Sequence, residues 1–393
     1  MKVEPACTLT PRFEGNPPRS ILVLRPGAMG DVLLTTPAVR ALRRAFPEAR
    51  VCVLVTVSGE AILRQNTNVD EIIVLDKSSL RSQASVIPLV RRKEFDLVVD
   101  FLCNPRTAMI ALFSGAPWRL GYDVRMRKIA YNLRKTRDEY REGKKVVKYA
   151  AQVNIDMLRC LGIESVDTRL DLTVNDTAQT RMDDFLRSHS VEMGEFVGVC
   201  PAGTWPAKTW EVGKFAGLAD RIVSELGRKV VILWGPRERE LARKMARLMK
   251  TEGLLSCETG IDEVSAIIRR CALFVSNDSG LKHIAVALAT PTVTIFGPTN
   301  PQTWNPSKSA HRAVYAGVDC RFCDKNSCED MRCMKELSVV TVFSAVEEVL
   351  EVGPQNDSSS DESGARYGST HGERSMLGGK SGRRYGSVRG EQY

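Results

Sequence analysis

The sequence predicts an α/β protein made of two similar halves, each built around a parallel sheet. In the first half, apolar segments alternate with amphipathic ones; the apolar segments lie near residues 21–24, 51–57, 72–75 and 97–101, and the amphipathic ones near 32–46, 59–65 and 82–93. After a polar stretch, the alternation resumes with apolar segments at residues 196–200, 230–234, 274–275 and 292–296. Such alternation is typical of parallel sheets with helices on both faces. We therefore expect two α/β halves with a cleft between them.

Composition and length agree with a two-domain globular protein. The chain has 393 residues, of which 43% are hydrophobic and 26% charged, enough to form two cores. We predict domains at residues 20–175 and 190–350, a flexible N-terminal extension at 1–19 and a disordered tail at 351–393, which is rich in Ser, Gly and Arg. No apolar run reaches the 18 or more residues of a membrane span, and the first twenty residues lack a secretory signal. We expect a cytoplasmic protein.

A glycine turn, Arg25 to Asp31, joins the first predicted strand to a helix expected from Val32 onward. Gly27 and Gly30 would let the backbone approach a ligand closely. Their spacing fits neither the dinucleotide fingerprint nor the P-loop, so a nicotinamide cofactor is not indicated. The Asp31 carboxylate could accept a proton from an attacking hydroxyl; alternatively, it only caps the following helix.

Two further turns in the second half have residues suited to bind an anion. Lys208 lies in the segment 201–210 after a predicted strand, and the run Asn277 to Gly280 joins another strand to a helix that carries His283. Helix N-termini attract phosphate, and ligands of open α/β sheets bind at the carboxyl ends of strands. The alternatives are a surface lysine and a turn whose Asp278 or Ser279 only caps the helix.

Positive charge is concentrated between Arg119 and Lys148. Eleven basic residues stand there against four acidic ones, and the whole chain carries a net charge of +9. A solvated helix and loop would account for such a run, but the local excess is large enough to attract an anionic partner such as a phosphorylated lipid. Few aromatic residues accompany it and no RNA-binding signature does, so no nucleic-acid partner is expected.

Taken together, the segments 25–31, 201–210 and 277–283, with Phe296 to Thr299, resemble glycosyltransferase family 9, the ADP-heptose:lipopolysaccharide heptosyltransferases. The resemblance covers about residues 20–350. It implies the GT-B fold, two Rossmann-like domains facing a central cleft, with the acceptor on the first and the nucleotide sugar on the second. It also implies an inverting, metal-independent transfer of heptose from ADP-heptose to an inner-core sugar of lipopolysaccharide.

The same resemblance implies roles for individual residues. Asp31 would be the general base, and Lys208 would stabilise the leaving diphosphate. Donor contacts are expected from Gly203, Thr204, Lys208, Glu238, Asp278, Ser279, Gly280 and His283, where the register leaves Glu240 as an alternative to Glu238. Acceptor contacts are expected from Arg25, Gly27, Arg119 and Arg125. The acceptor would be anionic lipopolysaccharide, reached by peripheral contact with the cytoplasmic face of the inner membrane.

Four of the eleven cysteines cluster near the carboxyl end. Cys320, Cys323, Cys328 and Cys333 are spaced C-x2-C-x4-C-x4-C. This spacing would suit a structural tetrahedral zinc site or an iron–sulfur cluster, although it matches neither common pairing of CxxC motifs. Reduced thiols or disulfides are the alternative, and disulfides are unusual in a reducing cytoplasm. No cofactor is expected to be required for catalysis.

Three other functions stay open at this point. A related transferase would use another nucleotide sugar, and a sugar-nucleotide epimerase of similar shape would consume donor without an acceptor. A non-catalytic nucleic-acid-binding protein would use the basic run and the cysteines, and its binding would depend steeply on salt.

Overall fold

The computed structural model describes residues 16–141 and 143–352. Most of the predicted N-terminal extension and nearly all of the predicted tail lie outside these residues. Within the described ranges, no helix is long and apolar enough to cross a membrane.

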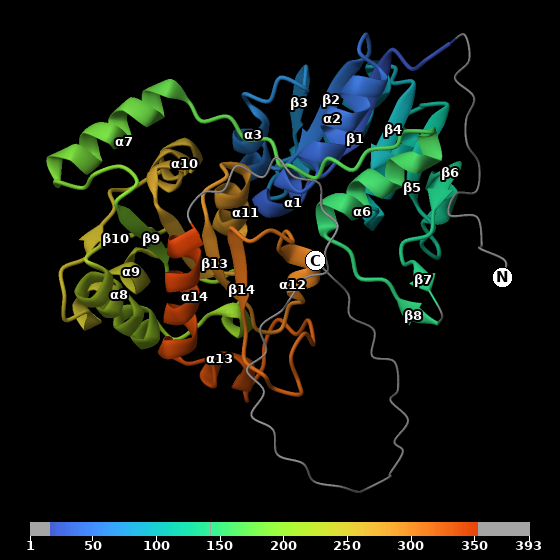
Figure 1. The fold of residues 1–393 in the computed structure, drawn as a ribbon. Coiled ribbons are helices and arrows are strands. Elements are labelled where there is room, and N and C mark those ends of the chain that lie inside the picture. The colour runs from blue at the N-terminus through green and yellow to red at the C-terminus, as the bar shows by residue number, and fades with distance from the viewer. Residues whose placement is uncertain (1–15, 142, 353–393) are drawn as a thin grey trace, which may run out of the picture. The chain divides into compact units, whose positions relative to one another are not determined.

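The first half is built on a six-stranded parallel sheet (Figure 1). Its strand order is β3-β2-β1-β4-β5-β6, and every neighbouring pair is parallel. The strands are β1 (Ser20–Leu24), β2 (Arg50–Val55), β3 (Glu71–Val74), β4 (Leu97–Asp100), β5 (Trp118–Tyr122) and β6 (Leu133–Lys135). The helices are α1 (Met29–Leu33), α2 (Thr36–Ala45), α3 (Val57–Leu63), α4 (Leu80–Arg92), α5 (Pro105–Phe113) and α6 (Ala150–Met157).

The second half repeats this topology. Its six parallel strands have the order β11-β10-β9-β12-β13-β14. They are β9 (Phe196–Cys200), β10 (Lys229–Ile232), β11 (Leu254–Leu255), β12 (Leu273–Asn277), β13 (Thr292–Ile295) and β14 (His311–Val314). The helices are α7 (Asp176–Ser188), α8 (Val212–Leu226), α9 (Arg239–Leu248), α10 (Ile261–Arg270), α11 (Gly280–Ala287), α12 (Pro301–Trp304), α13 (Arg332–Lys335) and α14 (Val339–Val352).

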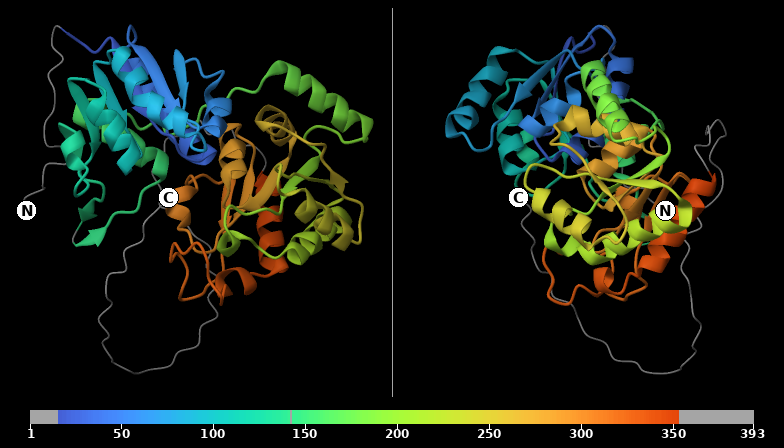
Figure 2. Two further views of the ribbon diagram at one scale, coloured as in Figure 1. Left: turned by 180° about the vertical axis from the view of Figure 1, so that it is seen from behind. Right: turned by 90° about the vertical axis from the view of Figure 1, so that its left-hand side faces the viewer.

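Helices cover both faces of each sheet, as the views of Figure 2 show. In the second half, α8 packs against α9 and α14, while α10 packs against α7 and α11. The strands between these layers are almost wholly apolar; Ile21 to Leu24 in β1 and Val230 to Ile232 in β10 are at most 1% exposed. Burial on both faces explains why these strands read as continuous apolar runs rather than as alternating ones. The predicted α/β class with two parallel sheets is confirmed.

One sequence expectation about local structure was wrong. The helix expected over residues 32–46 is two helices, α1 and α2, because Pro37 lacks an N–H and the hydroxyls of Thr35 and Thr36 donate to backbone carbonyls of the preceding turn. For the basic run, the alternative of a solvated helix and loop does not describe the segment. It instead contains β5, a short 3₁₀ helix η1 (Lys128–Ala130), β6 and the hairpin of β7 (Tyr140–Arg141) and β8 (Lys144–Lys145). Of the basic residues, Arg119 lies in β5 and Arg134 and Lys135 lie in β6, and the others lie in η1, the hairpin and the connecting segments.

Candidate active site

The first glycine turn presents Asp31 from the first turn of α1. Helix α1 begins at Met29 and its N-cap is Ala28, so the alternative in which Asp31 caps a helix starting at Val32 is wrong. The carboxylate remains 28% exposed. A Cβ atom added to Gly27 would lie 3.0 Å from Oδ2 of Asp31, which shows how closely the backbone of the turn approaches this side chain.

Arg25 holds Asp31 in place. Its Nη2 donates to Oδ1 of Asp31 at 3.0 Å, and its Nη1 donates to the carbonyl of Phe101 at 2.8 Å. The Gly27 amide in turn donates to the carbonyl of Arg25 at 2.8 Å. The structure thus brings together three of the predicted residues, and a charged bond to a fixed guanidinium orients the carboxylate.

The two other predicted acceptor residues stand apart from this turn. The guanidinium of Arg119 donates to the carbonyls of Ala130 and Ala116, which engages it within its own neighbourhood on β5. Arg125 is exposed in the loop after β5. Among the described residues, no hydrogen bond or ion pair joins either side chain to Asp31 or Arg25.

In the second half, the side chain of Asn277 forms hydrogen bonds with the segment that carries Lys208. The Asn277 side chain, which is fully buried, donates to the carbonyls of Pro201 and Ala202 and accepts from the amide of Trp210. These bonds hold both ends of the segment against β12. Lys208 lies between them in the 3₁₀ helix η3 (Pro206–Lys208), so its position is set by the neighbouring strand.

Lys208 reaches the turn after β12. Its Nζ donates to Oδ2 of Asp278 at 2.8 Å and lies 4.4 Å from the ring centroid of Trp205. The side chain is only 10% exposed, which rules out the interpretation as an ordinary surface lysine. Gly203 and Thr204 precede it in the same segment; Thr204 is exposed, and a side chain on Gly203 would collide with the hydroxyl of Thr209.

Asp278 lies at the centre of a buried charge cluster. Besides Lys208, its Oδ2 accepts a hydrogen bond from the hydroxyl of Thr299 at 2.8 Å, and its Oδ1 lies 3.0 Å from Nζ of Lys282. Burial opposes ionisation of the carboxyl, but the charges of Lys282 and Lys208 outweigh it and hold the pKa of Asp278 below its usual range. Burial lowers the pKa of Lys282, and the charge of Asp278 opposes that shift. The cluster therefore pairs one carboxylate with two lysines.

The N-terminus of α11 carries polar atoms that the protein leaves without partners. Ser279 is the N-cap residue but makes no side-chain capping bond. Its Oγ and Nδ1 of His283 are buried and have no hydrogen-bond partner among the described residues. Burial, and after it the charge of Lys282, holds the pKa of His283 well below its ordinary value, so the imidazole is neutral. Unpaired buried polar atoms beside a helix N-terminus are suited to receive an anionic ligand.

The turn with Asp31 and the turn with Asp278 lie next to each other, because α1 packs against α11. A Cβ atom added to Gly30 would lie 2.8 Å from Cδ2 of His283, and one added to Gly280 would lie 2.8 Å from Cγ of Met29. Side chains at these two glycines would therefore force the two turns apart.

Glu238 is engaged within its own turn. Its Oε2 accepts from the amide of Gly235 at 2.8 Å, and the alternative, Glu240, pairs with Arg243 and is 76% exposed.

Two residues of the cluster around Asp278 had no predicted role. Thr299 belongs to a segment that the sequence analysis singled out, and Lys282 stands four residues after Asp278, a spacing that puts both on one side of a helical turn.

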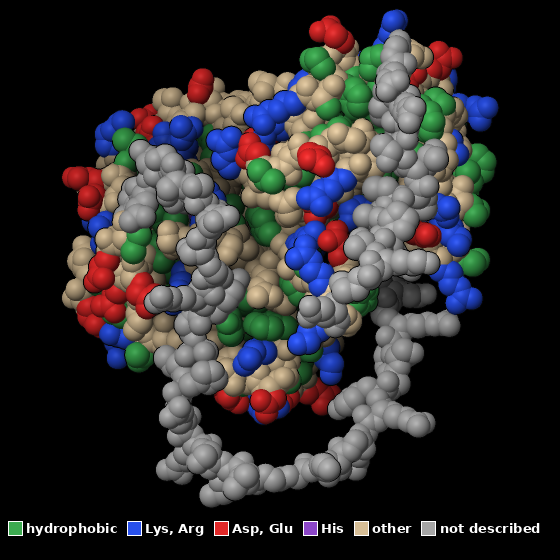
Figure 3. Space-filling view, turned by 45° about the vertical axis from the view of Figure 1, so that its right-hand side comes forward, with side chains coloured by type: hydrophobic (Ala, Val, Ile, Leu, Met, Phe, Trp, Pro, Cys, Tyr) green, Lys and Arg blue, Asp and Glu red, His purple; other side chains and the backbone are tan. Residues whose placement is uncertain are grey.

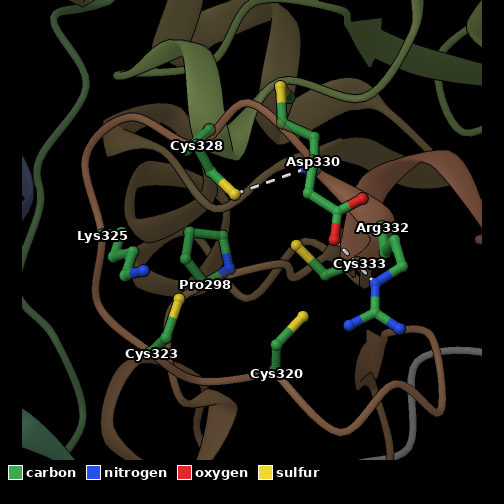
Figure 4. Close-up of a pocket in the computed structure, with 10 residues that line it drawn as sticks. Pro298, Cys320, Cys323, Lys325, Cys328, Asp330, Arg332 and Cys333 are labelled. Carbon is green, nitrogen blue, oxygen red and sulfur yellow. Dashed lines mark hydrogen bonds and ion pairs between the residues drawn. The ribbon is translucent and has the colours of Figure 1, made fainter.

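The four clustered cysteines are free thiols that surround one hollow (Figure 4). The hollow has a volume of about 190 Å³, and its wall includes Ala207 and Pro298, the neighbours of Lys208 and Thr299. Burial, and then the charges of the other three cysteines, raises the pKa of the Cys333 thiol. Among the described residues, no three His, Cys, Asp or Glu side chains are placed as metal ligands.

Comparison with known proteins decides the family. Residues 84–333 match the family described as glycosyltransferase family 9 (heptosyltransferase), which is more than half of the chain. The chain belongs to glycosyltransferase family 9. Lipopolysaccharide heptosyltransferase 3 of Escherichia coli is 26% identical over 299 residues, which cover 73% of this chain and 86% of that protein.

Solved structures of glycosyltransferase family 9 share the fold. The glycosyl transferase family 9 protein from Veillonella parvula is 25% identical, with a TM-score of 0.72 over 85% of this chain and 98% of that one. ADP-heptose lps heptosyltransferase II of E. coli is 21% identical, with a TM-score of 0.68 over 85% of this chain and 99% of that one. The GT-B fold expected from the resemblance is confirmed.

Proposed function

We propose that this family 9 glycosyltransferase moves heptose from ADP-heptose to an inner-core sugar of lipopolysaccharide, with inversion at the anomeric carbon. The observation that carries the proposal is the adjacency of two unlike turns. One presents the Arg25-oriented carboxylate of Asp31, and the other presents the Lys208 cluster and the N-terminus of α11. A base beside an anion site is what glycosyl transfer from a nucleotide sugar needs. The names of the relatives supply the donor and the acceptor.

In this mechanism Asp31 accepts the proton of the acceptor hydroxyl while the hydroxyl oxygen attacks the anomeric carbon. The bond between that carbon and the diphosphate oxygen breaks, and ADP leaves on the opposite face. Lys208 and the amides and hydroxyl at Ser279 and Gly280 stabilise the charge that develops on the diphosphate. These groups supply the positive potential, so the proposed step uses no catalytic metal.

The experiment is an assay of ADP release by the full chain from ADP-heptose, with and without heptose-free core lipopolysaccharide, in the presence and absence of a chelator. Acceptor-dependent release that survives chelation would support the proposal. No release from ADP-heptose, with release from another nucleotide sugar, would favour the related transferase. Release without acceptor would favour hydrolysis or an epimerase, and RNA binding without turnover would favour the nucleic-acid alternative.

For the acceptor side we propose a membrane-docking surface formed by α5 and η1, which pack against each other. Met126 and Ile129 are 81% and 73% exposed, and Met109 and Phe113, one helical turn apart, are also exposed. Arg125, Arg127 and Lys128 lie beside Met126 and Ile129 in the loop after β5 and in η1. On the face drawn in Figure 3, basic and exposed hydrophobic side chains likewise lie next to one another. Exposed apolar side chains next to basic ones suit an anionic bilayer surface. In this proposal, such a surface presents the lipid-linked acceptor at the cytoplasmic face of the inner membrane.

Vesicle sedimentation would test the docking surface. We expect the wild-type chain to bind phosphatidylcholine vesicles that contain phosphatidylglycerol and not pure phosphatidylcholine vesicles. Ile129→Asp should abolish this binding, whereas Val166→Asp, at a position 85% exposed elsewhere in the chain, should not. Equal binding by both variants would rule out this surface.

We also propose that the four cysteines hold a structural thiophilic metal such as Zn²⁺. Their spacing and their position around one hollow support it, and binding would draw the sulfur atoms closer than they stand. Metal analysis of the full chain, purified under reducing conditions, should give one ion per chain, lost on Cys320→Ser and Cys323→Ser together. A chain that holds no metal and in which the thiols of the four clustered cysteines all react freely would refute this proposal.

A further inference from the structure

Lys282 is a buried cation that the transfer mechanism does not use. Its side chain is 0% exposed, and its Nζ donates to the carbonyl of Trp304 and lies 5.2 Å from the ring centroid of Phe296. A charged ammonium in such surroundings is costly unless it is paired. The group that pairs it is Asp278, whose Oδ1 lies 3.0 Å away.

Lys282 and Lys208 occupy different places around the same carboxylate. Lys282 contacts Oδ1 from inside the protein, whereas Lys208 contacts Oδ2 and keeps 10% of its side chain exposed. One carboxylate against two ammonium groups leaves the cluster with one surplus positive charge. Of the two lysines, Lys208 is the one with part of its side chain exposed. Next to Asp278 in the chain, Oγ of Ser279 has no hydrogen-bond partner among the described residues.

We propose that Lys282 is the permanent counter-ion of Asp278 and thereby lets Lys208 exchange the carboxylate for phosphate oxygens of the donor. The proposal rests on the proposed function, because it takes the donor diphosphate to bind at Lys208. When Lys208 turns to the diphosphate, Asp278 keeps Lys282 and the hydroxyl of Thr299. Without Lys282, the same movement would leave a buried carboxylate without a cation, which is strongly unfavourable. Lys282 is thus a positioning residue that acts through Asp278 on Lys208.

Calorimetric titration of the full chain with ADP tests this exchange in four proteins. Lys282→Met makes the cluster neutral, and we expect the Kd for ADP to rise at least tenfold. Asp278→Asn releases Lys208, and we expect ADP to bind several-fold more tightly than to wild type. The double variant Lys282→Met/Asp278→Asn restores the surplus charge, and its ADP affinity should return at least to the wild-type value. In turnover, Lys282→Met should raise the KM for the donor more than it lowers kcat.

A matched control is Lys214→Met. Lys214 is another lysine of the second half whose Nζ donates to backbone carbonyls, those of Lys335 and Leu337, and its loss should leave the Kd for ADP unchanged. A merely structural Lys282 would give thermal destabilisation that the second substitution does not relieve, and no recovery of ADP affinity. That result, or wild-type affinity in Lys282→Met, would overturn the inference.

Two further outcomes are decisive. If Lys282→Met does not fold, Asp278→Asn carries the test, because loss of ADP binding in that variant would make Asp278 a donor contact and overturn the inference. If the wild-type chain itself fails to bind ADP, the proposed donor is wrong and the inference falls with it. Wild-type binding of ADP together with an unaffected Lys282→Met would refute the inference alone.

Discussion

The two halves of the molecule share one strand order, yet the charged residues of their candidate sites differ in burial. In both, the segment after the central strand β1 or β9 carries a functional group. Asp31 and its partner Arg25 come from one turn and are 28% and 13% exposed. Asp278 and Lys282 are 4% and 0% exposed, and the cluster draws on segments after β9, β12 and β13. The carboxylate that we propose as the base stays near solvent, whereas the buried charge cluster is assembled from segments that follow several strands.

The largest expected effect would show whether the chemistry depends on the exposed pair of the first half. Asp31→Asn removes the base and should lower kcat by about 10²- to 10⁴-fold. The Kd for ADP should change less than twofold, because the proposed donor contacts are in the second half. Steady-state assays and ADP titration measure the two quantities separately.

Asp184→Asn provides the control for Asp31→Asn, because Asp184 lies on α7 with its side chain 65% exposed. Its kcat should equal that of the wild-type chain. A fully active, correctly folded Asp31→Asn protein would assign the base to another group and remove the proposed division of labour between the halves.

The sequence predicted the fold well because buried parallel strands leave a strong signal. The apolar runs at β1, β9 and β13 and the glycines that follow them are local features, and the strands formed where they were expected. The short strands β5 and β6 were missed because their sequences mix apolar residues with Arg119 and Arg134. In such strands the pairing with a neighbouring strand, β4 for β5 and β5 for β6, decides the structure rather than the local sequence pattern.

The candidate site was predictable in its members but not in its contacts. Lys208 and Asp278 are 70 residues apart, and only the pairing of β9 with β12 brings them together. The same holds for Thr299, which arrives from the segment after β13. Arg25 holds Asp31 through a bond across six residues, a contact that the sequence did not predict, and its expected contact with the acceptor stays a prediction.

An acid titration would sharpen the comparison, because the buried histidines among the described residues, His283 and His311, both belong to the second half. Burial lowers the pKa of His311 to about 4. Its folded-state pKa lies below the ordinary value near 6.5, so the unfolded chain binds more protons between these values. The stabilisation is complete above pH 6.5 and is lost as pH falls toward 4. From pH 7 to pH 5, the free energy of unfolding should fall by about 2 kcal/mol through this group.

The first half should resist the same titration. Burial opposes the ionisation of Glu139, but Lys135 and Lys148 hold its pKa at about 2, so its contribution persists until the pH falls below about 4. Urea unfolding at pH 7 and pH 5 measures the change, and His311→Gln should reduce it, whereas the part due to the lowered pKa of His283 should persist. If His311→Gln left the fall in the free energy of unfolding between pH 7 and pH 5 unchanged, a group other than His311 would cause that fall.

The smallest expected effect concerns two helix caps, one in each half. Asn104 caps α5 by accepting from the Thr107 amide at 2.9 Å, and Asn175 caps α7 by accepting from the Thr177 amide at 2.9 Å. Replacing either asparagine with alanine should cost about 1 kcal/mol. If the halves unfold together, each variant shifts one common urea transition and the double variant shifts it by the sum.

If the two halves unfold independently, the two cap substitutions should affect different transitions. Four of the five tryptophans, Trp205, Trp210, Trp234 and Trp304, lie in the second half, so fluorescence reports mainly on that half, whereas far-ultraviolet circular dichroism reports on both. Asn104→Ala would then shift the dichroism transition and leave the fluorescence transition in place, while Asn175→Ala would shift both. The close packing of α1 on α11 at Gly30 and Gly280 favours a common transition, because opening either half would expose the surface that the other covers.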